Sequence, residues 1–430
     1  MRASGDWPAL ESRNFRLYIG GQAISLVGTS MQQVAVAWLV YRLTQSPLAL
    51  GAVAFATEMC GVAMVLFGGL LADRASPLRV VLASQSLAML QALALATLVL
   101  TGHATLPGIV ALSCFLALVN GLDVPARQVL VAHLVDRRQM GNAIVLTSVA
   151  TDLSRLVGPS LGGAIVSAYG EWPCFLLNAA SYLFVIGALL AVRIAPPPEP
   201  VAAPAEATAG VGARLAEGFR YTWNHGLMRN ALLLVALVAF AGGPYMVLMP
   251  VMAAQVLGGD ASTLGLLAAS TGIGALGGAL HLGRRGTATG YDRLLGLGAG
   301  VFGTSLALFS QSAWLPLSAL LLAACGYGLM LLMACTHTLL LLLADEDKRG
   351  RVMSLFTLSF MAAVPFGSLA AGALASVVHV PAVLMGGGIA CALGAVAHRM
   401  RLGAPLQDRR STPRHDQRPA PRSGAGIDLP

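Results

Sequence analysis

Twelve long apolar stretches constrain the fold of this chain more than any other feature of its sequence. A helix needs roughly 20 apolar residues to cross a bilayer, and each stretch is close to that length. Because the stretches are continuous rather than alternating, they disfavour a β-barrel. We therefore expect an all-α membrane protein with twelve transmembrane helices. The stretches are 15–40, 48–72, 79–101, 107–130, 141–168, 173–194, 229–256, 263–283, 293–311, 315–343, 352–377 and 382–400.

Composition supports this class. Hydrophobic residues make up 56% of the chain and charged residues only 11%, whereas soluble domains are about 25% charged. The six cysteines all lie inside apolar stretches and form no CxxC pair, which is not the pattern of a secreted disulfide scaffold. A soluble enzyme and a disordered protein are excluded on the same grounds.

The basic residues predict the orientation in the membrane. With the N-terminus in the cytoplasm, Arg42 is the only basic residue that falls in an outside loop. The positive-inside rule therefore predicts that both termini are cytoplasmic, in a bacterial inner membrane. It also accounts for the net charge of +8, so no nucleic-acid partner is expected. The basic residues assigned to inside loops are Arg74, Arg79, Arg137, Arg138, Arg284, Arg285, Lys348, Arg349 and Arg351.

A weak internal repeat at a constant offset of 209 residues predicts two similar halves. Gly158 matches Gly367, and Gly68-Gly69 matches Gly277-Gly278. Compositional bias in a glycine-rich chain is the alternative explanation. A parallel repeat requires an even number of spans in each half, and six fits. Two parallel six-helix halves around a central cavity are a transporter architecture, the major facilitator fold. The expected parts are a cytoplasmic N-terminus 1–14, a first half 15–194, a cytoplasmic linker 195–228, a second half 229–401 and a disordered cytoplasmic tail 402–430.

The linker and the tail have their own compositions. Residues 196–200 read Pro-Pro-Pro-Glu-Pro, which is typical of an extended linker. Residues 214–229 are expected to return to the membrane face as a short amphipathic helix. The arginine-rich tail could bind anionic lipid or a partner, and the chain is expected to be a monomer.

Several motifs carry a resemblance to a known family. Gly69-Leu70-Leu71-Ala72-Asp73-Arg74 resembles the loop 2–3 signature of the major facilitator superfamily, and Arg155-Leu156-Val157-Gly158-Pro159 resembles its fifth-helix antiporter motif. Asp123-Val124-Pro125-Ala126-Arg127 and Lys348-Arg349-Gly350-Arg351 are similar to segments of the branch that includes the enterobactin exporter and macrolide efflux proteins. The resemblance extends over about residues 11–400, and it departs from the family after Arg74, where the usual basic cluster is reduced to Arg79.

The resemblance implies a cytoplasmic latch. The family places the acid at the position of Asp73 against the start of the eleventh helix, which here carries Arg349 and Arg351. A plain turn that fixes topology is the alternative. Asp123 and Arg127 are four residues apart and share a helix face, as either a switching or a static ion pair. The residues assigned to the latch are Gly69, Asp73, Arg74, Asp123, Arg127, Arg349 and Arg351.

The fifth predicted helix contains a proline and a set of glycines. Pro159 has no backbone donor and weakens the helix locally, and Gly158, Gly162 and Gly163 leave room for close helix packing. A bend that seals the outer half against proton leak and ordinary tight packing are both open interpretations.

Three titratable residues inside predicted spans are candidates for proton coupling. Glu58 lies 11 residues before Gly69, hence about 16 Å from the cytoplasmic end. An ionisable group at that depth costs on the order of 3 kcal/mol and should face a cavity or a partner. Asp152 and His337 also lie near midspan. A substrate contact or a structural hydrogen bond for Glu58, a pair of Asp152 with Arg155, and simple packing of His337 remain open.

The candidate cavity residues are polar or adaptable side chains within spans. Gln22, Ser25, Thr29 and Gln33 form a stripe at helical spacing on the first helix. Arg155 could contact an anionic substrate such as a siderophore. Tyr245 and Met249 could form an adaptable apolar wall, with core packing as the alternative.

No P-loop, metal-ligand cluster or catalytic triad is visible in the sequence, so neither an enzyme nor an ATP-driven pump is expected. The resemblance implies a secondary active exporter of small amphipathic molecules, either siderophore-like metabolites or drugs, that works by alternating access with proton antiport. Its expected partners are membrane lipid and the substrate, and its only energy source is the proton motive force. An uptake carrier of the same fold and a non-transporting membrane sensor are the alternatives.

Overall fold

The computed structural model describes residues 7–72, 76–192, 211–285 and 290–411. Within these ranges the backbone alone is described for 65–72, 211–215 and 402–411. All regular structure in these ranges is helical. The first helices are η1 (Pro8–Glu11), α1 (Arg13–Thr44), α2 (Pro47–Ala72), α3 (Pro77–Leu100), α4 (Leu106–Leu134), α5 (Met140–Tyr169) and α6 (Trp172–Ala191). They are followed by α7 (Val211–Asn224), α8 (Gly226–Leu237), η2 (Val238–Gly242), α9 (Tyr245–Val251), η3 (Met252–Val256), α10 (Ala261–Arg284), α11 (Tyr291–Phe309), α12 (Leu315–Leu343), α13 (Arg349–Ala375) and α14 (Val380–Ser411).

Ten helices in the described part of the chain are long and apolar enough to cross a membrane. The run from α8 to η3 counts as one of them, because Gly226–Val256 is continuous. Helices α5 and α11 are not among the ten. α5 carries Asp152 and Arg155 in its middle, and α11 begins with Asp292 and Arg293, so each has less apolar length than its neighbours.

Helix boundaries follow local sequence signals. Ser12 caps α1 by accepting a hydrogen bond from the Phe15 amide at 3.3 Å, and Asp260 caps α10 through the Ser262 and Thr263 amides. Such caps satisfy donors that the first turn of a helix leaves free. Proline stands in the first turn of α3 and α4, where its missing N–H costs nothing.

The predicted span 229–256 is present but is not a regular helix. Its segments η2 and η3 are π-helical turns on either side of α9. Pro250 lies inside α9, and proline removes one hydrogen bond from a regular helix. Wider π turns accommodate such an interruption without ending the helical run.

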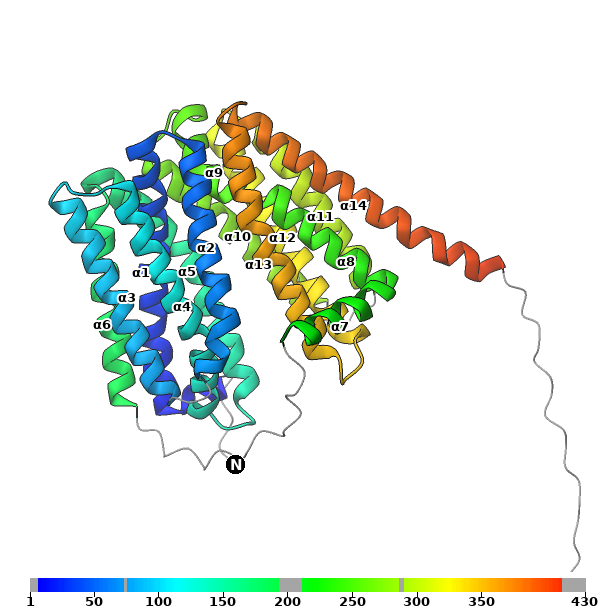
Figure 1. The fold of residues 1–430 in the computed structure, drawn as a ribbon, viewed down its shortest axis with the longest axis horizontal. Coiled ribbons are helices and arrows are strands. Elements are labelled where there is room, and N and C mark those ends of the chain that lie inside the picture. Colours follow the sequence, from blue (N-terminus) through cyan, green and yellow to red (C-terminus); the bar gives the residue numbers. More distant parts are fainter. Residues whose placement is uncertain (1–6, 73–75, 193–210, 286–289, 412–430) are drawn as a thin grey trace, which may run out of the picture.

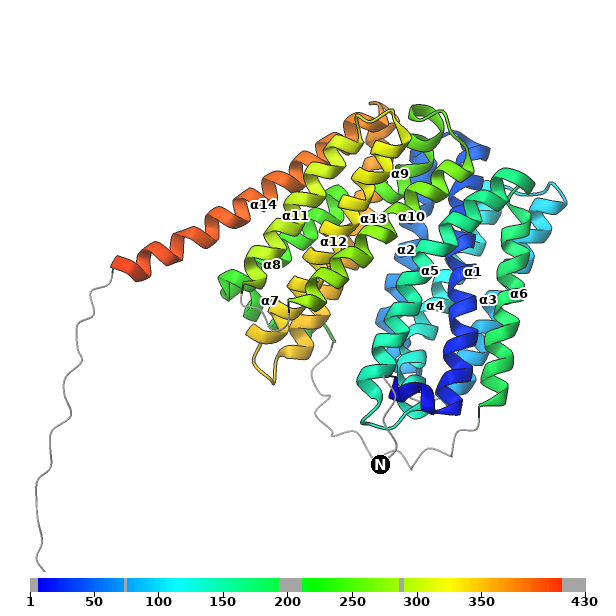
Figure 2. The same cartoon turned by 180° about the vertical axis from the view of Figure 1, so that it is seen from behind.

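The long helices form two groups that lie side by side (Figures 1 and 2). Helices α1–α6 make up the first group and α8–α14, with η2 and η3, the second. We call the end that holds η1, α7 and Asp345 the α7 end, and the end that holds Gln45, Gly170 and Asp260 the Asp260 end. The groups contact each other toward the Asp260 end and diverge toward the α7 end (Figure 1).

The amphipathic segment and the last helix differ from the expected bounds. The amphipathic helix is α7, which ends at Asn224 rather than at residue 229. Helix α14 continues to Ser411, so the expectation that the tail is disordered from residue 402 is wrong for 402–411. The local sequence does not explain this extension, because Gly403 and Pro405 in the segment are both poor helix formers.

Candidate functional site

The first contact between the two groups joins α5 to α10 at the Asp260 end. The Ser167 hydroxyl donates a hydrogen bond to the Asp260 carboxylate, which also accepts from the amides of Ser262 at 3.0 Å and Thr263 at 3.3 Å. The hydroxyls of Ser167 and Ser262 and these amides lower the pKa of Asp260 to about 2. Asp260 therefore holds α5 and α10 together at this end as an ionised carboxylate.

Glycines continue this contact along the two helices. A methyl group added to Gly163 would lie 2.5 Å from the carbonyl oxygen of Ala261, and one added to Gly272 would lie 3.2 Å from that of Arg155. Gly158 and Gly162 pack instead against Ser30 and Met31 of α1. The glycines around Pro159 thus serve two neighbours, while α5 itself remains one continuous helix.

The second contact between the groups joins α2 to α13. A methyl group added to Gly51 would lie 2.5 Å from the carbonyl oxygen of Ser368. The rings of Phe55 and Phe366 meet edge to face with centroids 5.3 Å apart. Among the described residues, every hydrogen bond, ring contact and close glycine approach that joins the two groups lies between the Asp260 end and the level of Arg155.

Glu58 lies just beyond the α2–α13 contact, toward the α7 end. It is seven residues after Gly51, two helical turns, so it lies on the same face of α2. Its side chain is exposed, and no hydrogen bond or ion pair reaches it from the described residues. Glu58 therefore stands on the face of α2 that separates from α13 where the groups diverge.

Asp152 has the corresponding place on α5. It lies 11 residues before Gly163, three helical turns, and so shares the face that contacts α10. Its side chain is half-buried, whereas that of Arg155 is exposed. The two residues form no ion pair within 4 Å, although the Arg155 charge acts on Asp152. Glu58 and Asp152 thus both belong to the first group. Glu58 lies on the face of α2 that turns toward α13, and Asp152 lies on the face of α5 that turns toward α10.

His337 is separate from this arrangement. Its exposed side chain packs edge to face against Phe356 of α13, with ring centroids 6.0 Å apart. No hydrogen bond within the described part of the chain joins His337 to Glu58 or Asp152. Packing is the interaction that the structure gives this histidine.

The polar stripe on α1 does not form one open face. Gln22 and Ser25 are each only 2% exposed. Thr29 is directed at α6, where its hydroxyl lies 3.3 Å from that of Tyr182. Only Gln33 is exposed. Helical spacing placed the four residues on one side of α1, but packing of α6 against that side covers three of them.

The predicted apolar wall is part of the core. Tyr245 and Met249 are 3% and 1% exposed, and the Tyr245 ring packs edge to face on Phe302 at 5.8 Å. In this arrangement of the groups they line no open surface.

Part of the expected latch can be examined. Gly69 lies in α2, and Asp73 and Arg74 fall outside the described residues. Arg349 pairs with Glu346 at 3.8 Å. Arg351 pairs with Glu217 of α7. The arginines at the start of α13 therefore have acidic partners on their own side of the molecule.

Asp123 and Arg127 form the ion pair expected from their spacing. Asp123 is 1% exposed and accepts two further hydrogen bonds from α3, from the Ser84 hydroxyl at 2.8 Å and the Gln85 amide at 3.1 Å. The pair thus joins α4 to α3 inside the first group.

The sequence analysis missed two sets of polar residues. The first set lies in the buried core of the first group: the Asn178 side-chain amide donates to Gln32 at 2.8 Å, and Gln32 donates to Gln91 at 3.0 Å. The second set is an ion pair near the Asp260 end, where Arg42 pairs with Glu171 at 2.7 Å. Polar residues inside apolar stretches signal such networks, but their partners are more than 50 residues away in sequence.

Comparison with known proteins identifies relatives of the whole chain and of parts of it. The family described as transmembrane secretion effector, a major facilitator group, matches residues 4–423. The enterobactin exporter EntS of Citrobacter koseri is 27% identical over 274 residues, and that of Shigella flexneri is 26% identical over the same length. These matches cover 63% of this chain and 63% and 62% of the two exporters, so the chain spans less than two thirds of their length.

The fold also resembles solved transporter structures. A bacterial homologue of the human lysosomal transporter Spinster, in an inward-facing and unoccupied conformation, superimposes with a TM-score of 0.67 at 14% identity. That likeness covers 93% of this chain and 96% of the homologue. At this identity it concerns the fold alone.

Proposed function

Because the chain belongs to the transmembrane secretion effector family of the major facilitator superfamily, we propose that it is a secondary active exporter that works by alternating access. The observation that carries the proposal is the asymmetric contact between the two helix groups. They are closed at the Asp260 end, and two acids, Glu58 and Asp152, stand where their faces begin to diverge. An exporter needs such a site accessible from one side at a time.

The proposed architecture is twelve transmembrane helices in two parallel halves, 15–194 and 229–401, joined by a cytoplasmic linker. The offset of 209 residues supports it, because Gly163 and its counterpart Gly372 both contact the opposite group. Gly163 lies against Gly265 of α10, and Gly372 lies against Gly51 of α2. Related glycines therefore make related contacts, as a parallel repeat requires.

The proposed location is a bacterial inner membrane with both termini in the cytoplasm. Basic residues concentrate in the sequence assigned to the α7 end, and the one arginine at the other end, Arg42, is neutralised by Glu171. Such a distribution supports a cytoplasmic location for the α7 end. In this orientation the structure corresponds to a state open toward the cytoplasm, ready to load an export substrate.

Proton antiport is the proposed source of energy, without a cofactor. A membrane potential of about 100 mV and one pH unit supply roughly 3.7 kcal/mol per proton, enough to sustain a gradient of roughly 400-fold. Glu58 and Asp152 would take up protons when the contact between the groups at the Asp260 end opens. They would release the protons in the state that faces the cytoplasm. Return to the outward state would engage the latch of Gly69, Asp73 and Arg74 with Arg349 and Arg351.

The proposed substrate is a small amphipathic molecule, such as a siderophore-like metabolite or a drug. The exporter names of the relatives support the siderophore class. Arg155, which is exposed and adjacent to the diverging face, supplies a positive charge for a carboxylate or catecholate.

Transport into energised inverted vesicles tests this proposal. Radiolabelled enterobactin, a macrolide and a cationic dye would be offered to vesicles containing the protein and to vesicles without it. We expect at least one compound to accumulate in an energy-dependent way and to leave when a protonophore is added. Accumulation only in right-side-out vesicles would establish uptake instead, and none in either would favour the sensor.

A further inference from the structure

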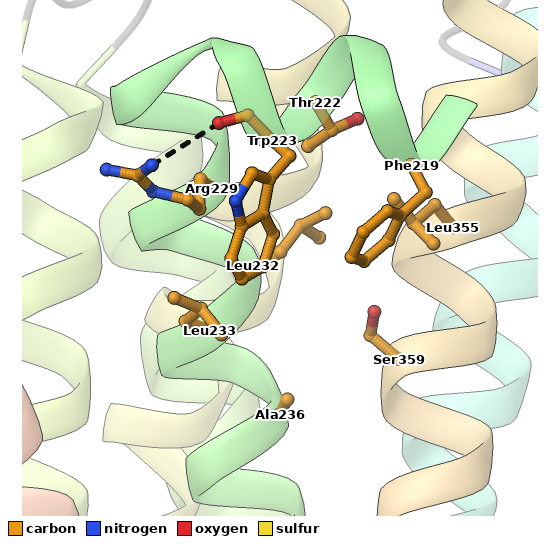
Figure 3. Close-up of a pocket in the computed structure, with 9 residues that line it drawn as sticks. All are labelled: Phe219, Thr222, Trp223, Arg229, Leu232, Leu233, Ala236, Leu355 and Ser359. Atoms are coloured by element: carbon orange, nitrogen blue, oxygen red, sulfur yellow. Dashed lines mark hydrogen bonds between the residues drawn. The ribbon is translucent and has the colours of Figure 1, made fainter. Parts of the chain in front are cut away.

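A groove lies at the α7 end, between α7, α8 and α13 (Figure 3). It encloses about 370 Å³, including the space at its open side. Helix α7 covers it from above, and α8 and α13 form its two walls. The residues that line it are Phe219, Thr222, Trp223, Arg229, Leu232, Leu233, Ala236, Leu355 and Ser359.

The groove has an apolar interior that extends along the membrane-spanning helices. Leu232, Leu233 and Ala236 follow Arg229 along α8, and seven residues of helix span about 10 Å. Leu355 lies opposite, on α13, and Phe219 closes the top (Figure 3). This depth and composition suit a hydrocarbon chain rather than a polar ligand.

The rim of the groove carries an uncompensated positive charge. Arg229 donates a hydrogen bond to the Trp223 carbonyl at 3.4 Å, and its guanidinium lies 5.6 Å from the centre of the Trp223 ring. No acidic side chain within the described residues forms an ion pair with it. Arg401 of α14 is close by, since it donates to Asn230 at 3.4 Å. Tryptophan and arginine together are typical of the level of the lipid headgroups.

We infer that this groove binds one acidic phospholipid of the leaflet at the α7 end, with its phosphate at Arg229 and an acyl chain between α8 and α13. Charge complementarity selects this occupant, because each basic residue near an anionic headgroup contributes about 1 kcal/mol to binding, about fivefold in affinity. The inference rests on the proposed orientation in the membrane, and it requires neither transport nor proton coupling.

A lipid at this place would also fix α7. That helix is tied to α13 by the ion pair of Glu217 with Arg351, and to the loop before α13 by the hydrogen bond from Tyr221 to Asp345 at 2.9 Å. An acyl chain under Phe219 and Trp223 would fill the space beneath α7 and join its apolar face to both walls.

Quenching of Trp223 fluorescence by brominated lipid tests the inference. The protein would retain Trp223 alone, with its other four tryptophans changed to phenylalanine, in nanodiscs that contain acyl-brominated phosphatidylglycerol or phosphatidylcholine. We expect Trp223 to be quenched at about fivefold lower mole fraction of the acidic lipid. A variant that retains only Trp314, at the Asp260 end and 65% exposed, should show no such preference.

Two substitutions separate a site from general lipid contact. Arg229→Gln should remove the preference for acidic lipid, while Arg284→Gln, an exposed arginine of α10 at the same end, should keep it. Ala236→Phe should reduce quenching by both lipids because it fills the groove. Equal quenching by both lipids in the parent, or a preference that survives Arg229→Gln, would overturn the inference. Displacement of both lipids alike by an exported compound would assign the groove to substrate and overturn it too, whereas failure of transport alone would leave this result unaffected.

Discussion

Asp260 illustrates how one carboxylate can close the α5–α10 contact without sensing physiological pH. Its hydrogen bonds hold its pKa at about 2, below the ordinary value of 3.8. A depressed pKa means that the stabilisation is fully present above the unfolded value and is lost as the pH falls through the folded one. Between pH 5 and 8 the carboxylate stays ionised, so pH dependence of transport in that range must come from other groups.

The α5–α10 contact should therefore keep its geometry from pH 5 to pH 8. Spin labels at Ala168 and Gln255, both exposed, would report the separation of α5 from η3 by pulsed electron paramagnetic resonance. We expect one unchanged distance over this range. Asp260→Asn preserves a capping side chain but weakens the charge-assisted bond from Ser167, so it should increase the separated population about fivefold. A midpoint between pH 5 and 7 that Asp260→Asn abolishes would contradict this account.

The buried pair of Asp123 with Arg127 should be important for stability. Asp123→Asn leaves the Arg127 charge without its partner, and breaking a buried ion pair costs about 3 kcal/mol or more. We expect a clear fall in the melting temperature of the purified protein. Asp136→Asn, in an exposed loop, is the matched control and should melt like the parent. If both variants melted alike, the pair would be a marginal contributor.

At the scale of elements, the glycines of α5 determine how closely the two groups meet. Gly163→Ala places a methyl group 2.5 Å from the Ala261 carbonyl oxygen, and overpacking of this kind costs about 1–3 kcal/mol. We expect it to shift the labelled distance described above toward the separated state by about tenfold. Gly187→Ala on α6, where nothing lies within 4 Å, gains the same helix propensity without the clash. An equal effect of both substitutions would indicate a change of helix stability rather than of contact.

The sequence predicted the helices well because apolar length is a local property. Ten of the twelve stretches match a single helix to within a few residues at both ends, the last one continues to Ser411, and 229–256 is divided into α8, η2, α9 and η3. Which side of a helix faces its neighbours is not a local property, because it depends on where the other helices pack. The stripe of Gln22, Ser25 and Thr29 has helical spacing, but only the position of α6 determines that it is covered.

Candidate residues were predictable to different degrees for the same reason. Asp123 and Arg127 are four residues apart, so their ion pair could be inferred from sequence. Asp260 could be recognised as a helix cap, but its partner Ser167 lies 93 residues earlier. The depth of Glu58 could be estimated from residue count, whereas its place beside the α2–α13 contact required the structure.

At the scale of the whole molecule, the central claim is that two acids on the diverging faces couple protons to export. Both lie beyond a contact that is already closed, and no basic side chain pairs with either within the described residues. A carboxyl group without a fixed counter-ion can be neutral or charged as the faces close or open, which is what exchange of a proton for a substrate requires.

Collapse of a pH gradient in energised inverted vesicles tests this claim most directly. The compounds would be siderophores, macrolides and cationic dyes, and the variants Glu58→Gln and Asp152→Asn, with Asp347→Asn, in an exposed loop, as the control. We predict that a substrate collapses the gradient with the parent and the control, and that Glu58→Gln or Asp152→Asn reduces the response at least tenfold. Full collapse in both of these variants, at parental expression, would contradict the account.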